Sequence, residues 1–136
     1  MPPRAYSPSS NALARKIEKL AQDSWKEVGL SPSHAYLLML AIERPGIQPT
    51  DLVNQLLLTP STITRLIEKL EEKKLVIREA EGKTTSVLPT QKGKQLMPQL
   101  NKCLANFYSS YSNILGKEDS ARLVQSMNKI TDKLRG

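Results

Sequence analysis

The side chains of this sequence that are best suited to binding chemistry are those with hydroxyl groups or positive charges. They gather in the stretch "TPSTITRLIEKLEEKKLVIREAEGKTTSVLPTQKGK", residues 59–94. Such groups form hydrogen bonds and ion pairs with base edges and phosphates, so the pattern favours double-stranded DNA as the partner. The candidate contact residues from this pattern are Ser61, Thr62, Thr64, Arg65, Lys69, Lys83, Thr84 and Thr85.

These candidates fall in two places. The first four lie in the opening turns of a predicted helix, where a helix that enters the major groove meets base edges, and Lys69 lies nearer the DNA backbone. The last three lie at the tip of a predicted basic hairpin, within reach of the flanking minor groove or its phosphates. Charges of this kind also occur on solvated helix faces, and Glu68, Glu71 and Glu72 dilute the basic character of the helix.

Catalysis has little support in the sequence, which contains one histidine, one cysteine and no glycine-rich phosphate loop. We therefore predict no enzyme, no cofactor and no metal site. His34 is expected to be a partly exposed side chain near a helix start rather than a ligand or a sensor. Cys103 lies on an apolar stripe between Leu100 and Leu104, so we expect a buried and unreactive thiol.

Composition limits the class of fold. The chain has 136 residues, 39% apolar and only 4% aromatic, which suits one compact, mostly helical domain built on aliphatic side chains. Its formal net charge of +7 favours an anionic partner. The N-terminus lacks the apolar segment of a signal peptide and no apolar run reaches the length of a membrane span, so we expect no membrane partner and a cytoplasmic location.

Proline and glycine divide the sequence into elements. Ser7-Pro8, Ser31-Pro32, Gln48-Pro49 and Thr59-Pro60 each precede a helical pattern, because proline is favoured at the first helical position. The expected helices cover about 8–28, 32–44 and 49–57, the segment after Thr59, then 91–115 and 118–135. A change to alternating pattern with a turn at Gly82 predicts a two-stranded hairpin within residues 75–88.

Two short helices with so tight a connection as "LLTPS" favour a helix-turn-helix. The expected fold class is therefore mostly α with a small β-hairpin wing, a winged helix-turn-helix flanked by N- and C-terminal dimerisation helices. Residues 1–136 form one domain, in which 31–90 make the DNA-binding lobe and 8–28 together with 91–135 make the helical dimerisation region. We expect a homodimer because the terminal helices carry more apolar surface than the small core can cover.

The segments "GLSPSHAYLLMLAI", "TPSTITRLIEKLEEKKLVIRE" and "VLPTQKGKQL" resemble the multiple-antibiotic-resistance regulator (MarR) family across nearly the whole chain. The resemblance implies a two-fold dimer that binds a pseudo-palindromic operator, usually as a repressor that a small molecule or an oxidant releases. It places base reading on Ser61, Thr62, Thr64 and Arg65. It also assigns to Arg78 the role of the strand arginine that supports the wing.

The sequence departs from the family pattern in the wing. The family's wing usually bears an Asp-Arg pair in a longer loop, whereas this chain has "EAEGKTTS" with Lys83 in place of the arginine. An ammonium lacks the planar fork of a guanidinium, so we expect a weaker contribution of the wing to specificity. Pro89 is expected to shorten the second wing strand, because proline cannot donate to the hydrogen-bond ladder.

Dimer contacts and an effector pocket are the remaining expectations. The predicted dimer interface contains Leu13, Ile17, Phe107, Tyr111, Val124, Met127 and Ile130. Trp25, Tyr36, Met39 and Tyr108 are candidates for lining a small-molecule pocket, although each is equally consistent with the core. The alternatives to a regulator are a winged-helix protein-interaction module and a nonspecific architectural DNA binder.

Overall fold

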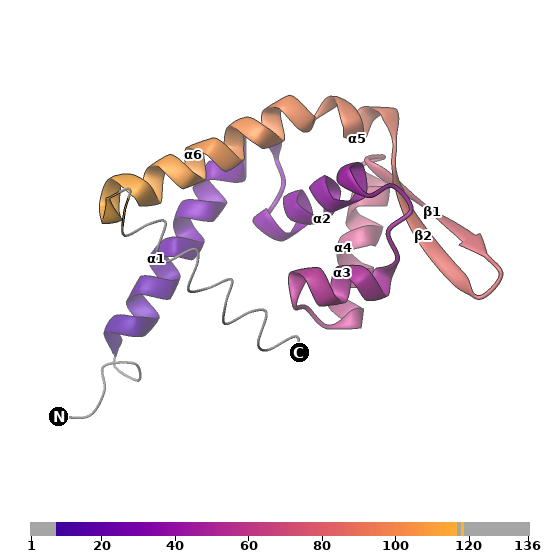
Figure 1. The fold of residues 1–136 in the computed structure, drawn as a ribbon, viewed down its shortest axis with the longest axis horizontal. Helices are drawn as coiled ribbons and strands as arrows, with labels where there is room; N and C mark the ends of the chain where they lie inside the picture. Colours follow the sequence, from indigo (N-terminus) through magenta and orange to yellow (C-terminus); the bar gives the residue numbers. More distant parts are fainter. Residues whose placement is uncertain (1–7, 117, 119–136) are drawn as a thin grey trace.

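The computed structural model describes residues 8–116 and residue 118, which form helices and one hairpin (Figure 1). The elements are α1 (Pro8–Trp25), the 3-10 helix η2 (Lys26–Val28), α2 (Pro32–Glu43), α3 (Pro49–Leu56), α4 (Pro60–Glu72), β1 (Val76–Glu81), β2 (Thr84–Pro89), α5 (Gln91–Gln95) and α6 (Met97–Leu115). The mostly helical fold with a hairpin wing is confirmed. The helix expected over 118–135 lies outside the described residues, apart from residue 118.

The chain has two parts (Figure 1). The long helices α1 and α6 lie side by side in one part, and α2, α3, α4 and the hairpin form the other. The segments α2 to β2 are the lobe that the sequence predicts as a winged helix-turn-helix. The hairpin extends away from this lobe as a thin projection.

Side-chain hydroxyls cap the helices that form this lobe and lead out of it. Ser31, Thr59 and Thr90 each accept a hydrogen bond from the backbone N–H three residues further on, at 3.0 to 3.3 Å. At α2 and α4 the next residue is proline, whose fixed φ suits the first helical position. The helix starts predicted at these positions are confirmed.

Two helix predictions need correction. The first helix ends at Trp25 and continues as the 3-10 turn η2, and the long helix expected over 91–115 is broken at Leu96 into α5 and α6. Pro98 has no N–H to donate to the carbonyl four residues earlier, so the α-helical ladder cannot run through it. Instead the N–H of Leu96 donates to Gly93 O at 3.1 Å, a tighter turn that closes α5.

The expected shortening of the second wing strand is wrong. β2 runs to Pro89, which pairs with Val76 at the start of β1 in an antiparallel register. Proline is tolerated here because it is the last residue of the strand, where one missing donor interrupts no further pairing. Ile47 adds an isolated bridge to Val87, which anchors the base of the wing to the segment between α2 and α3.

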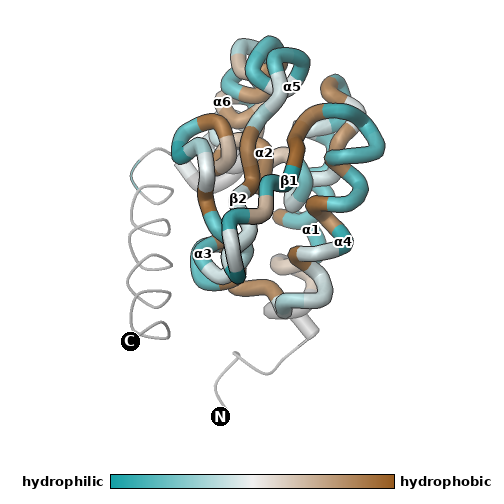
Figure 2. The backbone as a smooth tube through the Cα atoms, turned by 90° about the vertical axis from the view of Figure 1, so that its right-hand side faces the viewer, coloured by the Kyte–Doolittle hydropathy of each residue, from teal (hydrophilic) through white to brown (hydrophobic). Residues whose placement is uncertain are grey.

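The core surrounds α2, whose residues Ala35, Leu37, Leu38 and Ala41 are all fully buried. Figure 2 shows the apolar character of α2 at the centre of the lobe, with the hairpin in front of it. The other buried apolar residues are Ala21, Trp25, Leu30, Ile47, Leu52, Ile63, Leu66, Ile67, Leu70, Leu75, Val76, Val87, Leu100 and Cys103. Four of these belong to α4, so burial fixes which face of that helix points outward.

The end of α4 is a site of backbone strain. Lys74 has φ +61°, in the left-handed region. This backbone conformation costs residues other than glycine about 1 to 2 kcal/mol. The N–H of Leu75 donates to Leu70 O at 2.9 Å, so the turn is a helix-ending motif that usually contains glycine.

We therefore expect Lys74→Gly to raise the free energy of unfolding by about 0.5 to 1 kcal/mol, because relief of the strain exceeds the added entropy of the unfolded chain. Urea denaturation measures this change. Lys74→Ala is the matched control, since it removes the same charge and keeps the strain. Equal stability of the two variants would contradict the assignment of strain to this residue.

Candidate nucleic-acid interface

Helix α4 presents a polar surface at its N-terminal half. Ile63, Leu66, Ile67 and Leu70 are buried against α2 and α3, which leaves the intervening positions facing outward. Ser61, Thr64 and Arg65 are exposed, as their predicted role in reading bases requires.

The hydroxyls in this first turn differ in their freedom. Thr62 is half-buried, and its Oγ1 lies 2.9 Å from Thr59 Oγ1, so it takes part in the cap of the helix. Thr64 Oγ1 donates to Pro60 O at 3.0 Å, which leaves its oxygen able to accept from an outside donor. Ser61 Oγ is 3.3 Å from the capping oxygen of Thr59 and is exposed.

Arg65, Lys69 and Lys73 follow one another at intervals of four residues and so share one edge of α4. We refer to these three residues as the basic edge. Arg65 Nε donates to Ser61 O at 3.4 Å and its guanidinium has no ion-pair partner among the described residues. Lys69 Nζ lies 3.5 Å from Glu72 Oε2, and both side chains are exposed, so this pair is weak.

The wing is tied to the far end of α4. Arg78 Nη2 lies 2.8 Å from Glu71 Oε1, which joins β1 to the last turn of the recognition helix. Arg78 shares a face of the sheet with buried Val87, its partner in the register. Its guanidinium is therefore directed to the protein, in agreement with the supporting role that the family resemblance implies.

The tip of the wing carries Lys83, Thr84 and Thr85. Lys83 and Thr84 are exposed, Thr85 is half-buried, and Thr84 Oγ1 donates to Glu81 O at 2.8 Å, so this hydroxyl stabilises the turn. The described structure thus brings the predicted residues into two separate groups, one on α4 and one at the end of the hairpin.

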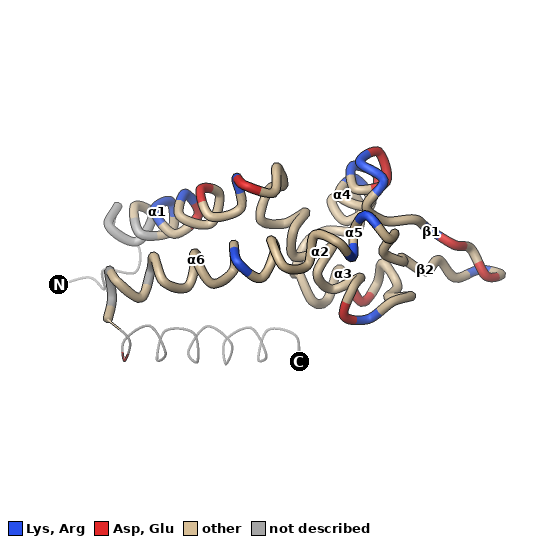
Figure 3. Tube along the Cα trace, turned by 90° about the horizontal axis from the view of Figure 1, so that it is seen from above, with Lys and Arg blue, Asp and Glu red and all other residues tan. Residues whose placement is uncertain are grey.

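The hairpin is not basic, contrary to the expectation from the sequence. Residues 76–89 contain two cations, Arg78 and Lys83, and two carboxylates, Glu79 and Glu81, and Arg78 already pairs with Glu71. In Figure 3 the acidic residues lie along β1 and at the turn. These carboxylates would repel phosphate, and Lys83 is the cation of the hairpin that has no ion-pair partner among the described residues.

A second contact holds the wing and α4 in place. Thr90 Oγ1 donates to Lys74 O at 2.7 Å while it caps α5, and Lys92 Nζ donates to Lys73 O at 3.1 Å. These bonds satisfy carbonyls at the end of α4 and place cations near the negative end of the helix dipole. Thr90 and Lys92 therefore act as a clasp that joins the start of α5 to the end of α4.

Cys103 is fully buried, as expected from its place on the apolar stripe. Burial, with a smaller effect of Glu27, raises the pKa of the Cys103 thiol. A thiol with a raised pKa and no exposure forms little reactive thiolate, which disfavours a redox role.

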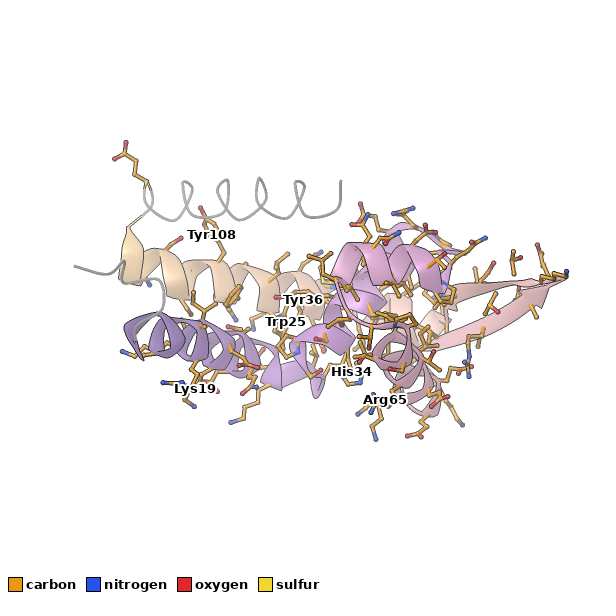
Figure 4. All side chains as sticks on the ribbon, turned by 90° about the horizontal axis from the view of Figure 1, so that it is seen from below. Lys19, Trp25, His34, Tyr36, Arg65 and Tyr108 are labelled. Carbon is orange, nitrogen blue, oxygen red and sulfur yellow. The ribbon has the colours of Figure 1, made fainter. Side chains whose placement is uncertain are left out.

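An apolar hollow lies between α2, α3 and α6. Tyr36, Met39 and Leu104 line a cavity of about 270 Å³, and Tyr108 lines a neighbouring hollow that shares Leu104. Trp25, in contrast, is fully buried and packs edge to face against Tyr36, with ring centroids 5.4 Å apart. Figure 4 shows both aromatic rings between the long helices and the lobe.

Other kinds of site find no support in the described part of the chain. Residues 8–116 and 118 contain no group of three or more His, Cys, Asp or Glu side chains that could hold a metal ion. No helix within the same residues is both long enough and apolar enough to cross a membrane.

Comparison with known sequences gives the same assignment as the geometry. A family model described as MarR family matches residues 28–84, which contain α2 to the start of β2. The chain is 27% identical over 93 residues to the HTH-type transcriptional regulator YybA of Bacillus subtilis, covering 66% of this chain and 62% of that protein. It is 26% identical over 124 residues to the HTH-type transcriptional regulator SarZ of Staphylococcus epidermidis, covering 88% and 82%. The match therefore spans less than two thirds of the Bacillus protein.

Solved structures share the fold at low sequence identity. The MepR-DNA complex of S. aureus has a TM-score of 0.78 at 17% identity, over 95% of this chain and 97% of that one. CouR of Rhodococcus jostii RHA1, bound to p-coumaroyl-CoA, has a TM-score of 0.78 at 19% identity, over 89% and 87%. The sequence relatives YybA and SarZ are transcriptional regulators, in agreement with the prediction that the chain is not an enzyme. This chain is therefore similar in sequence to the MarR family over its helix-turn-helix and to the transcriptional regulator SarZ over most of its length, and it shares the fold of the solved structures.

Proposed function

We propose that this regulator binds a pseudo-palindromic DNA site as a homodimer and represses transcription from it. The observation that carries the proposal is the exposed first half of α4, where Ser61, Thr64 and Arg65 face outward from a helix that is locked to the core by four buried residues. Such a helix fits the major groove, and its hydroxyls and guanidinium match base edges and phosphates. The relative MepR, which has the same fold, forms a complex with DNA.

The homodimer rests on the surface of α1 and α6. Leu104 and Tyr108 on α6 are 41% and 46% exposed, and Ile17 and Phe107 are half-buried. A second copy would cover this apolar surface and would place two recognition helices on one duplex. Of the other predicted interface residues, Leu13 and Tyr111 have side chains outside the description, and Val124, Met127 and Ile130 lie outside the described residues.

Release by a small molecule is part of the proposal. The hollow between α2, α3 and α6 is apolar and includes the polar groups of Tyr36 and Glu43, a combination that suits an amphipathic organic ligand. CouR, with the same fold, was solved with p-coumaroyl-CoA bound. The buried thiol of Cys103 makes a small molecule a better candidate than an oxidant. A protein with these partners acts in the cytoplasm.

Selection of bound duplexes from a randomised DNA pool tests the proposal. We expect the purified protein to recover an inverted repeat whose half-sites lie about one helical turn apart. Binding without a recovered motif would favour the architectural role, and no binding would favour a protein-interaction module. Sedimentation of the free protein at micromolar concentration tests the dimer, and a monomer would contradict it.

A further inference from the structure

His34 is the only histidine of the chain and lies at the first turn of α2, beside the recognition helix. Its side chain is half-buried, and Nδ1 forms a hydrogen bond with Ser31 Oγ, the cap of the same helix. This bond fixes the ring and leaves Nε2 as the nitrogen that can contact another group. His34 is therefore partly exposed near a helix start, as the sequence predicts, but its ring is held in place by the helix cap.

The basic edge of α4 passes close to this imidazole. α2 packs against α4, and in Figure 4 His34 and Arg65 lie on the same side of the lobe. Burial lowers the pKa of His34, and the positive charges of Lys73 and Lys69 lower it further. Both lysines belong to the basic edge, and α4 packs against α2, so three side chains able to carry positive charge are gathered on this side of the lobe.

Among the described residues, Glu72 is the only carboxylate that forms an ion pair with these cations. Lys73 has no ion-pair partner among the described residues, and the pair of Lys69 with Glu72 is long and exposed. A group of cations with too few carboxylates nearby to neutralise it can bind an external anion. The site continues from Arg65 along the same edge of α4, so the anion that fits it is the backbone phosphate of a duplex whose bases the first turn reads.

We propose that His34, Lys69 and Lys73 form a phosphate-binding cluster at the edge of the recognition helix, in which DNA binds the protonated imidazole. This inference rests on the proposed DNA-binding function. It adds His34, which lies outside α4 and the wing, to the DNA interface. It also implies that the protein takes up a proton when it binds DNA. In the protonated ring, Nε2–H donates to a phosphate oxygen while Nδ1–H donates to Ser31 Oγ.

The direction of the pH effect follows from linkage. In the free protein, burial and the two lysines hold the pKa of His34 below its usual value, which favours the neutral ring. A phosphate beside the ring favours its charged form and raises the pKa in the complex. Because the complex then binds more protons than the free protein, affinity rises as pH falls through the interval between the two pKa values.

The test uses a mixed-sequence DNA duplex, because a phosphate contact does not depend on the bases. The single imidazole gives resolved proton signals, and we expect its pKa to rise when the duplex is added. At constant ionic strength we expect affinity to increase by about tenfold between pH 8 and pH 5.5 for each unit of this rise. His34→Gln keeps a polar side chain without a titrating ring, and should lose that increase.

Lysine variants test whether the cluster exists. Lys73→Gln should raise the pKa of His34 in the free protein and weaken DNA binding several-fold. Lys19→Gln is the matched control, because it also removes one exposed lysine but lies on α1, away from the lobe (Figure 4). It should leave the pKa of His34 unchanged.

The outcomes separate the two proposals. Binding whose pH dependence is the same in wild type and His34→Gln, or an imidazole pKa that DNA leaves unchanged, would overturn the cluster and leave the DNA-binding function standing. Absence of binding to any duplex at any pH would overturn the DNA-binding function itself.

Discussion

Replacing Gly93 with alanine is expected to lower the free energy of unfolding by about 3 kcal/mol, the upper range for overpacking a well-filled site. A Cβ built on Gly93 lies 2.3 Å from Leu75 O and 3.2 Å from Leu38 Cδ1. The first of these atoms is backbone at the end of α4 and accepts from the N–H of Thr90 at 3.0 Å, so it cannot move without breaking the clasp.

This expectation opposes what helix propensity predicts. Gly93 lies within α5, where replacement of glycine by alanine normally stabilises a helix by about 1 kcal/mol. The steric conflict costs more than this gain. A loss of stability in Gly93→Ala therefore indicates that α5 lies as close to the end of α4 as it does in the structure. Since the clasp also positions the wing, DNA affinity should fall together with stability.

Urea denaturation of Gly93→Ala and Gly82→Ala provides the comparison. Gly82 at the wing tip has φ +62° and open space around it, so alanine there costs about 1 kcal/mol of backbone strain and no collision. Stability of Gly93→Ala equal to that of Gly82→Ala or higher would mean that α5 and the end of α4 are further apart.

Features that depend on neighbouring residues were accessible from the sequence. The hydroxyls of Ser31, Thr59 and Thr90 cap helices through bonds that span three residues, so their types and the prolines beside them suffice for prediction. The apolar stripe of α4 likewise identified the face that is buried, and thereby the outward position of Arg65.

Features that depend on distant segments were not accessible. His34 and Lys73 are separated by 39 positions, and only the packing of α2 against α4 brings their charges together. Gly93 permits the close approach of α5 to Leu75, and nothing in the residues around it in the sequence indicates this. Lys74 in the left-handed region gave no signal, because lysine rarely adopts that conformation.

The charge of the wing cannot be judged from its residues alone, because the sequence does not show which of its cations form ion pairs. Lys83 and Arg78 give the hairpin sequence a basic look, but Arg78 is neutralised by Glu71 of α4, and Glu79 and Glu81 remain exposed. The wing therefore contributes little electrostatic attraction. Under the proposed function, we expect specific recognition of DNA to depend mainly on α4, and most of all on the guanidinium of Arg65.

Arg65→Ala is accordingly expected to weaken binding to the selected operator by about 1 to 3 kcal/mol, the range for loss of a base contact. Arg65 is exposed in the second turn of α4, and its weak bond to Ser61 O leaves most of the guanidinium fork free for a base or a phosphate. Fluorescence anisotropy with operator and with mixed-sequence duplex measures both affinities at one salt concentration.

The ratio of the two affinities separates base reading from attraction between charges. Arg15→Ala removes the same charge from exposed α1 and should reduce neither affinity more than slightly. Arg65→Lys retains the charge but loses the planar fork, so it should recover affinity for mixed-sequence DNA and fail to recover preference for the operator. If Arg65→Lys restored full preference, Arg65 would bind phosphate only, and base reading would pass to Ser61 and Thr64, whose hydroxyls discriminate bases less strictly than a bidentate guanidinium.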